Sequence, residues 1–268
     1  MSYHILLDGR RIDPSPVVGR IKVEPSLPSN HKKQNNMSLL KLLKPVCINS
    51  EKVRLGQNQD GGYVINKVAI ENSSILYTYG VGGDTGYEVA YRAMTGNPVM
   101  LYDPTHDMPN VPEGMTFHKV GLGTGDNRFT EHRVKNSDNN YDMLLKIDTE
   151  GAEYEYFMDE SIILLGQYCT GIILEIHHLN EPMRQLIMKR ILKDLDEYFF
   201  LTHIHGNNWG GEFGLEGFSV PNVMELSFVN KRICELRTDC SDIYPSPLLD
   251  FPNRADQPDC PLLFLKHI

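Results

Sequence analysis

The sequence predicts a large α/β domain built around a mostly parallel β-sheet, and three observations lead to this fold class. Short apolar segments alternate with segments of helical periodicity from about residue 75 onward. A chain of 268 residues is long enough for one large domain with an additional arm. Its hydrophobic fraction of 41% is enough for a substantial core. Because strands and helices follow one another, we expect parallel strands with helices on both faces of the sheet.

Seven segments have the length and apolar character of β-strands, and helical patterns follow the first, fourth and fifth of them. The strand candidates are residues 75–79, 99–103, 115–120, 142–148, 171–177, 199–205 and 223–229. The longest helical pattern covers residues 181–198 and has Pro182 near its first turn, where proline is well tolerated. The apolar stripe expected on this helix consists of Met183, Leu186, Ile187, Ile191 and Leu195.

The two ends of the chain differ from this alternating region. Residues 1–36 are rich in proline and polar side chains, so they predict an arm or linker and leave residues 37–268 as the folded domain. Residues 38–47 predict a short amphipathic helix ended by Pro45. The C-terminal region is rich in proline and predicts irregular structure with a short apolar element at its end.

Composition and charge exclude several classes of function. The formal net charge of −9 disfavours nonspecific binding to nucleic acid, which requires a cationic surface. No apolar run approaches the ~20 residues of a membrane span, and the first residues lack the pattern of a secretory signal. The five cysteines form no CxxC pair, so we expect reduced thiols and a cytoplasmic location.

A glycine cluster follows the first strand of the expected sheet. Gly80, Gly82 and Gly83 lie at the carboxyl end of residues 75–79, the edge where open parallel sheets bind ligands. A plain turn from strand to helix would explain these glycines equally well. Asp103 ends the second strand, 21 residues after Gly82, and an acidic residue there can accept both hydroxyls of an adenosine ribose. The combination favours an adenosyl cofactor.

The spacing of the glycines separates two classes of adenosyl cofactor. The pattern Gly80-x-Gly82-x-x-x-Gly86 departs from the GxGxxG that binds a pyrophosphate. Asp84 would repel a phosphate, and no lysine or arginine lies between Val68 and Tyr91. S-adenosylmethionine has no phosphate and carries a sulfonium cation, so an acidic pocket suits it. We therefore expect a methyl-donor site here rather than a nicotinamide site.

Six motifs together resemble a known family. They are RLGQNQDGGYVI, YTYGVGGDTGYE, LYDPTH, LLKIDTEGAEYE, LEIHH and HIHGNN, and they occur in this order within residues 53–265. In these motifs the chain resembles the FkbM-like class I methyltransferases, in particular a branch often linked to glycan decoration. The resemblance implies a Rossmann-like sheet of seven strands with the last strand antiparallel. It also implies S-adenosylmethionine as the cofactor and O-methylation of a hydroxyl, commonly on a sugar.

The resemblance also implies which residues contact the cofactor. The loop that precedes the sheet would close over the methionine end of the cofactor, the glycine turn would hold its middle, and the end of the second strand would bind its ribose. The cofactor-binding residues expected on this basis are Asp60, Gly62, Tyr63, Gly80, Gly82, Asp84, Asp103, Pro104 and Thr105.

Polar pairs end three strands: Asp148 with Glu150, Glu175 with His177, and His203 with His205. Methylation of an alcohol needs a group that accepts the hydroxyl proton, and a neutral histidine can do this near pH 7. A cation bound by carboxylates could instead lower the pKa of the hydroxyl. The expected catalytic residues are Asp148, Glu150, His177 and His205, with Asp148 foremost.

The same strand ends offer a set of metal ligands. Asp148, Glu175 and His177 could bind Mg²⁺ or Mn²⁺, although this oxygen and imidazole set suits either ion only loosely. Metal-dependent O-methyltransferases carry Asp-Asp or Asp-Asn after the fifth strand, whereas this chain has His177-His178, which argues against the metal. A structural role is the more common one for any single histidine of this kind.

Residues 206–222 predict a long glycine-rich loop above the site. Trp209, Phe213 and Phe218, together with the amides of Asn207 and Asn208, would form a cradle for a sugar ring. The leading hypothesis is therefore an O-methyltransferase acting on a sugar or glycan acceptor. The alternatives are a nicotinamide-dependent oxidoreductase or epimerase of nucleotide sugars and a cofactor-binding scaffold without catalysis. The sequence contains neither the phosphate-binding turn nor the Tyr-x-x-x-Lys pair that the oxidoreductase or epimerase would need.

Overall fold

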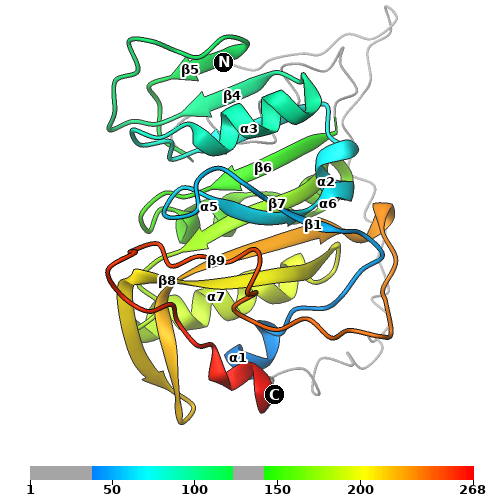
Figure 1. Cartoon of the computed structure of the whole chain (residues 1–268), viewed down its shortest axis with the longest axis vertical. Helices are drawn as coiled ribbons and strands as arrows, with labels where there is room; N and C mark the ends of the chain where they lie inside the picture. Colours follow the sequence, from blue (N-terminus) through cyan, green and yellow to red (C-terminus); the bar gives the residue numbers. More distant parts are fainter. Residues whose placement is uncertain (1–37, 123–141) are drawn as a thin grey trace, which may run out of the picture. The chain divides into compact units, whose positions relative to one another are not determined.

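The computed structural model describes residues 38–122 and 142–268. The predicted arm, residues 1–36, lies outside the described residues, so the division into an arm and a domain stays a prediction. Seven strands form the central sheet in the order β5-β4-β3-β6-β7-β9-β8 (Figure 1). Their bounds are β3 Ile75–Tyr79, β4 Val99–Tyr102, β5 Met115–His118, β6 Met143–Ile147, β7 Cys169–Ile176, β8 Phe199–Leu215 and β9 Phe218–Asn230.

Strands β3 to β7 pair in parallel, whereas β9 pairs antiparallel with both β7 and β8. The last strand of the chain is thus inserted antiparallel beside β7. This is the Rossmann-like arrangement of class I methyltransferases, so the predicted fold class is confirmed.

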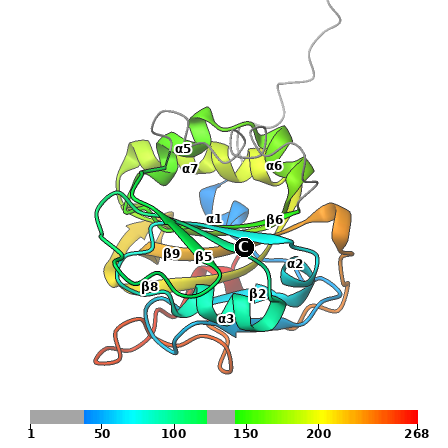
Figure 2. The same cartoon turned by 90° about the horizontal axis from the view of Figure 1, so that it is seen from above.

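Helices cover both faces of the sheet (Figure 2). One face carries α1 Leu39–Leu42, α5 Glu153–Asp159, α6 Ile162–Tyr168 and α7 Pro182–Leu195. The other carries α2 Lys67–Glu71, α3 Gly86–Thr95 and a small antiparallel sheet of β1 Lys52–Leu55 and β2 Tyr63–Asn66. Two short 3₁₀ helices follow, η1 Lys231–Ile233 and η2 Leu263–Lys266, and η2 is the apolar element expected near the C-terminus.

The hydrophobic core is divided by the sheet into two layers. Leu145 and Ile172 pack toward α5, α6 and α7, while Leu144 and Ile173 pack toward α2 and α3. Neighbouring residues of a strand point to opposite faces, so a strand covered on both sides must be apolar throughout. Burying each such side chain contributes about 1.5–3 kcal/mol. This explains why the parallel strands appear in the sequence as continuous apolar runs.

Helix α7 begins at Pro182 as predicted, but its apolar stripe was only partly right. Ile191 and Leu195 are buried, whereas Met183 and Leu186 are 65% and 64% exposed. The buried face consists of Met188, Ile191, Leu192 and Leu195. This i, i+3, i+4, i+7 pattern is confined to the second half of the helix, where it packs on the sheet.

The predicted loop at residues 206–222 is instead a β-hairpin, formed by the extension of β8 and β9 (Figure 1, gold, lower left). The two strands continue to pair up to Leu215 and Phe218. Glu216 and Gly217 form the tip with φ values of 52° and 87°, the conformation of a tight two-residue hairpin turn. The glycines had suggested a long loop, but the two strands pair along this segment and make it a two-stranded arm.

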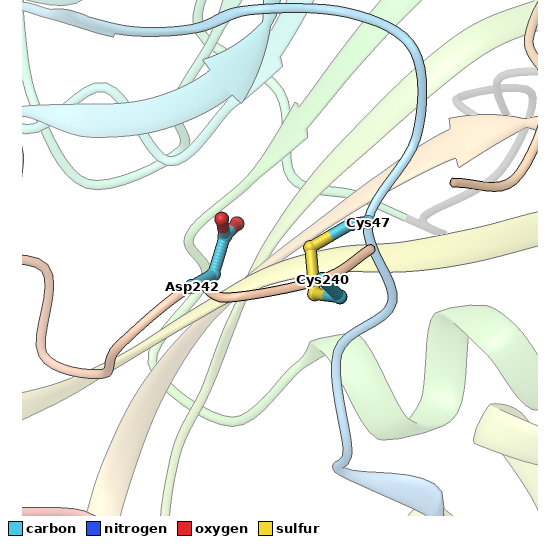
Figure 3. Close-up of side chains that lie close together, drawn as sticks. All are labelled: Cys47, Cys240 and Asp242. Atoms are coloured by element: carbon cyan, nitrogen blue, oxygen red, sulfur yellow. A yellow bond between two sulfur atoms is a disulfide. The ribbon is translucent and has the colours of Figure 1, made fainter. Parts of the chain in front are cut away.

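A disulfide joins Cys47 to Cys240, with the carboxylate of Asp242 nearby (Figure 3). The expectation of reduced thiols is therefore wrong for this pair, while Cys169, Cys234 and Cys260 take no part in a disulfide. Two disulfide sulfurs are not thiolates, so they do not form a metal site with Asp242. The cytoplasmic location loses its argument from thiols and stays a prediction. None of the helices in the described parts of the chain is long and apolar enough to cross a membrane.

Candidate functional site

A cavity of about 490 Å³ opens at the carboxyl ends of β3, β4 and β6, and we call it the strand-end cavity. Its size is within the usual range for small-ligand sites. Ten of the residues predicted to bind cofactor or to act in catalysis line its wall: Asp60, Tyr63, Gly80, Gly82, Asp84, Asp103, Pro104, Thr105, Asp148 and Glu150. Gly62, Glu175, His177 and His205 lie outside the wall.

The glycine turn has one position where packing requires glycine and two positions that face open space. Gly80 has a φ of +79°, and a Cβ added there would overlap the carbonyl oxygen of Asp148. Gly80 therefore allows the ends of β3 and β6 to approach each other closely. A Cβ added to Gly82 or Gly83 would meet no atom within 4 Å. Both residues line the cavity, so a ligand has room beside this part of the turn.

Asp103 holds two turns together, a role that the sequence did not indicate. Its Oδ2 accepts hydrogen bonds from the amides of Val81 and Gly82, at 3.1 and 2.8 Å. Its Oδ1 accepts from the amide and hydroxyl of Thr105, both at 2.7 Å, and from the amide of His106 at 3.0 Å. Burial opposes ionisation, but these hydrogen bonds outweigh it and lower the pKa of Asp103 to about 2. Binding of a ribose by Asp103 stays a prediction, because it requires the carboxylate to exchange one of these partners.

The loop before β2 is fastened to the start of α3 by Asp84. Its Oδ1 accepts from the amide of Gly86 at 2.8 Å, and its Oδ2 accepts from Nε2 of Gln57 at 2.6 Å. Asp60, in the same loop, accepts a hydrogen bond from Nδ2 of Asn253 at 3.2 Å. A Cβ on Gly62 would overlap the carbonyl oxygen of Gln57, so this glycine serves the turn itself.

Two carboxyl groups meet at the hydroxyl of Tyr63, a residue of the cavity wall. Tyr63 Oη lies 2.9 Å from Oδ2 of Asp148 and 2.8 Å from Oε2 of Glu175. One hydroxyl proton can serve only one of these contacts, so the second needs a proton on a carboxyl group. Burial and the charge of Asp148 raise the pKa of Glu175 well above its usual value, which makes Glu175 the protonated partner. Tyr63 then donates to Asp148.

His177 lies among four carboxylates, one of which fixes its orientation. Its Nδ1 is 3.3 Å from Oε1 of Glu153, a fully buried residue that also accepts from the His177 amide at 2.8 Å. Its Nε2 is 3.7 Å from Asp148, 3.6 Å from Glu150 and 3.9 Å from Glu175. Burial would lower the pKa of His177, but the bond to Glu153 and the surrounding charges raise it to about 9.

The structure thus brings the three predicted metal ligands together. One ligand atom from each of Asp148, Glu175 and His177 lies within 4.8 Å of the others. Glu153 holds the opposite nitrogen of the imidazole, as carboxylates do for many metal-binding histidines. Sequence reasoning missed Glu153, although it stands at the start of α5 within the motif KIDTEGAE. These residues have the chemistry to hold a divalent cation.

Lys146 is a buried cation that sequence reasoning also missed. Its Nζ lies 3.7 Å from Oε1 of Glu88 and 4.7 Å above the centre of the Tyr63 ring. Burial would lower its pKa, but the charges of Glu88 and Asp148 raise it. The segment around the glycine turn holds no lysine or arginine, and this cation reaches the cavity from β6 instead. Strand alternation places Lys146 on the same face as Asp148, and that pattern could have found it.

The other predicted histidines lie outside the strand-end cavity, and two of them are held by carboxylates. Nδ1 of His205 is 3.0 Å from Glu225 and its Nε2 is 3.0 Å from Asp259, so neither nitrogen is free to accept a substrate proton. This geometry gives His205 a structural role and contradicts the catalytic one. Nε2 of His203 is 2.8 Å from Asp250, away from the strand-end cavity. His178 is exposed, with a φ of 55°.

The contacts of His205 with Glu225 and Asp259 predict how the stability of the fold depends on pH. Burial opposes protonation of His205, but the charge of Glu225 and the bonds to Asp259 and Glu225 outweigh it and raise the pKa to about 10. The folded-state pKa exceeds the unfolded value of ~6.5, so the stabilisation is complete below pH ~6.5 and is lost as the pH rises toward ~10. The whole contribution is on the order of 5 kcal/mol. In NMR spectra of histidine-labelled protein, we expect the His205 ring to stay protonated at pH 8. A midpoint near the unperturbed value would contradict this assignment.

The predicted sugar cradle is not formed as expected. Nδ2 of Asn207 donates to Glu175 at 2.8 Å, and Nδ2 of Asn208 donates to the carbonyl of Arg254 at 3.1 Å. Both amides are therefore structural. Trp209 is 60% exposed, and the Arg254 guanidinium lies 4.6 Å above its ring. Phe213 and Phe218 pack against the main core, so the aromatic residues do not gather on one open face.

Comparisons with known proteins add little to this geometry. No protein-family model and no curated protein matches the sequence. One solved structure with some likeness is the fibrillarin pre-rRNA processing protein of Methanococcus jannaschii. It is 11% identical, the match covers 68% of this chain and 83% of that chain, and the TM-score is 0.36. This likeness is too low to assign an activity or a family, so the fold assignment rests on the order and direction of the strands.

Proposed function

We propose that this chain is an S-adenosylmethionine-dependent O-methyltransferase that acts on a sugar hydroxyl of a glycan or glycoconjugate. The observation that carries the proposal is the strand-end cavity, in which an open glycine turn and Asp148 face the same space. The fold supports a methyltransferase in general. The FkbM-like branch, the sugar acceptor and the cytoplasmic location are supported by the sequence alone.

The charge of the cavity wall favours a sulfonium over a pyrophosphate. Among its described residues the wall carries six carboxylates, against Lys146 as the one lysine or arginine. Lys146 is directed to Glu88 and to the Tyr63 ring. A dinucleotide would bring two further negative charges into this acidic space, whereas a sulfonium is attracted to it. The open space beside Gly82 and Gly83 leaves room for an adenosyl group.

The chain's own residues supply what methyl transfer to an alcohol requires. S-adenosylmethionine, when bound, supplies a methyl group on a positively charged sulfur. The glycine turn positions it, and the acceptor oxygen must come to within about 3 Å of the methyl carbon. Transfer would join this methyl group to the acceptor oxygen and would leave the sulfur as an uncharged thioether. Asp148, which is 25% exposed at the cavity and held by Tyr63, is the group placed to receive the hydroxyl proton.

The Asp148, Glu175 and His177 group would hold Mg²⁺ or Mn²⁺ beside this position once Glu175 and His177 had released a proton each, because metal ligands bind in their deprotonated form. Such a cation would lower the pKa of the acceptor hydroxyl and orient a sugar diol. The ordering of His177 by Glu153, and of both carboxylates by Tyr63, supports this part of the proposal.

The proposed cofactor is tested by calorimetric titration of the full chain. We expect S-adenosylmethionine and S-adenosylhomocysteine to bind, and NAD and NADP to release no heat. Substituting Gly83→Trp should abolish binding, since the new side chain would occupy open space at the turn. Failure of S-adenosylmethionine to bind would exclude the proposal, and binding of a dinucleotide instead would favour the oxidoreductase.

The acceptor and the metal are tested by transfer of a labelled methyl group to a panel of terminal sugars. We expect label on a neutral sugar, loss of transfer with EDTA and recovery with excess Mg²⁺ or Mn²⁺. If EDTA does not reduce transfer, the cation has no role in the reaction and Asp148 alone acts as the base. Binding of S-adenosylmethionine without transfer to any sugar would favour the scaffold alternative.

A further inference from the structure

Lys146 is a buried cation of the strand-end cavity whose N–H donors have no acceptor among the described residues. The residue is 4% exposed and belongs to the cavity wall. Its Nζ is 3.7 Å from Oε1 of Glu88, which is beyond hydrogen-bond distance, and no other described residue gives it a hydrogen bond or an ion pair. A buried ammonium in this state is costly, so a ligand that supplies an acceptor would be stabilised here.

The groups that flank this ammonium belong to the same cavity. Glu88 and Tyr63 both line the wall, and Nζ lies 4.7 Å from the centre of the Tyr63 ring. The side chain of Lys146 is itself 5% accessible. The ammonium is therefore enclosed by residues of the wall, on the face of β6 that also carries Asp148.

The charge of the wall restricts the kind of acceptor that this ammonium can receive. An ammonium forms its strongest hydrogen bonds with an oxyanion such as a carboxylate. The described wall also carries six carboxylates, so a ligand with net negative charge would be repelled. An α-amino acid group avoids this conflict, because its own ammonium accompanies its carboxylate. The wall thus fits an amino-acid group whose carboxylate meets Lys146 and whose ammonium meets the surrounding carboxylates.

S-adenosylmethionine ends in such a group, so this inference rests on the function proposed above. Its adenosyl part has room beside Gly82 and Gly83, and its sulfonium would lie near Asp148. Positions 146 and 148 are about 7 Å apart along a strand, a distance that the carbon chain between sulfur and carboxylate can span. We propose that Nζ of Lys146 donates to the α-carboxylate of the bound cofactor and so fixes the direction in which the cofactor lies.

The test compares S-adenosylmethionine with its decarboxylated analogue by calorimetric titration of the full chain, without acceptor. The analogue keeps the adenosyl group, the sulfonium and the amine but lacks the carboxylate. An acidic wall alone would favour the analogue, because its net charge is more positive. We expect the opposite order, with S-adenosylmethionine bound at least tenfold more tightly, since only its carboxylate can accept from Lys146.

A double variant, Lys146→Met with Glu88→Gln, tests the residue itself. It removes the ammonium together with its paired carboxylate, so neither charge is left buried alone. We expect the affinity for S-adenosylmethionine to fall tenfold or more and that for the analogue to change less than threefold. Glu88→Gln alone is the matched control and should keep the preference. Its amide oxygen can still accept from the Thr78 hydroxyl, as Oε1 of Glu88 does at 3.0 Å.

Three results would overturn the role of Lys146: equal affinity of the wild-type chain for the two ligands, tighter binding of the analogue, or an unchanged preference in the folded double variant. Circular dichroism establishes folding, and if the double variant does not fold, the order of the two ligands on the wild-type chain decides. Failure of the wild-type chain to bind either ligand would exclude the proposed function itself. The two failures are therefore distinguishable.

Discussion

Asp148→Asn is expected to reduce methyl transfer by about a thousandfold while the chain stays folded and still binds its cofactor. A misplaced or missing proton acceptor typically costs on the order of 10²–10⁴ in rate. Asparagine keeps the size of the side chain but cannot take up a proton, and it is a poor ligand for a cation in place of the carboxylate. Oδ2 of Asp148 accepts from Tyr63, and an amide oxygen can still accept there, which preserves the packing.

The measurement is kcat for the best acceptor, alongside calorimetry with S-adenosylmethionine. The dissociation constant should change less than about tenfold, because the glycine turn that holds the adenosyl group is unaltered. Asp196→Asn is the control, since Asp196 is 72% exposed at the end of α7 and pairs with Lys231 on the surface. If Asp148→Asn keeps more than a tenth of the wild-type rate, Asp148 does not have the role proposed here.

Gly80→Ala is expected to lower the free energy of unfolding by about 4 kcal/mol, the size typical of severe steric substitutions. Two costs coincide at this position. The φ of +79° is strained for alanine, and the added methyl group would overlap the carbonyl oxygen of Asp148. Relief requires the ends of β3 and β6 to separate, which would also distort the site, so cofactor binding should be lost.

Urea denaturation followed by circular dichroism measures this effect. Gly83→Ala is the matched control in the same turn, because its Cβ meets no atom within 4 Å and its φ is outside the left-handed range. We expect its stability to remain within about 0.5 kcal/mol of wild type. Equal stability of the two variants would show that the close approach of Gly80 to Asp148 is not maintained in solution.

The sheet could be predicted from the sequence because strands buried on both faces are uninterrupted apolar runs. Six of the seven strand segments contain such buried apolar residues, and Pro182 marked the start of α7. The exception is the edge strand β5, which was found although it has no buried residue. The extension of β8 and β9 could not be predicted, because the glycines and exposed polar residues of this segment show no hydrophobic periodicity. Their pairing depends on contact between the two strands, which a single segment does not reveal.

The candidate site was predictable in part for a similar reason. Residues directly after strands meet at one edge of a parallel sheet, so Asp103 and Asp148 could be placed from position alone. The hydrogen-bond partners could not be predicted from position, because they come from segments far apart in the chain. Glu153 holds His177, and Tyr63 joins Asp148 to Glu175. His205 was misassigned because its partner Asp259 lies 54 residues later, in a region without periodic structure.

The Cys47–Cys240 bond makes a closed covalent ring out of nearly the whole sheet, since 193 positions separate the two residues. Closing a ring of this size disfavours the unfolded chain by about 5 kcal/mol in the loop-entropy account. A protease that cut the β8–β9 tip at Glu216–Gly217 would open the ring without releasing a fragment. The nicked chain would migrate as one species until a reductant separated its two halves.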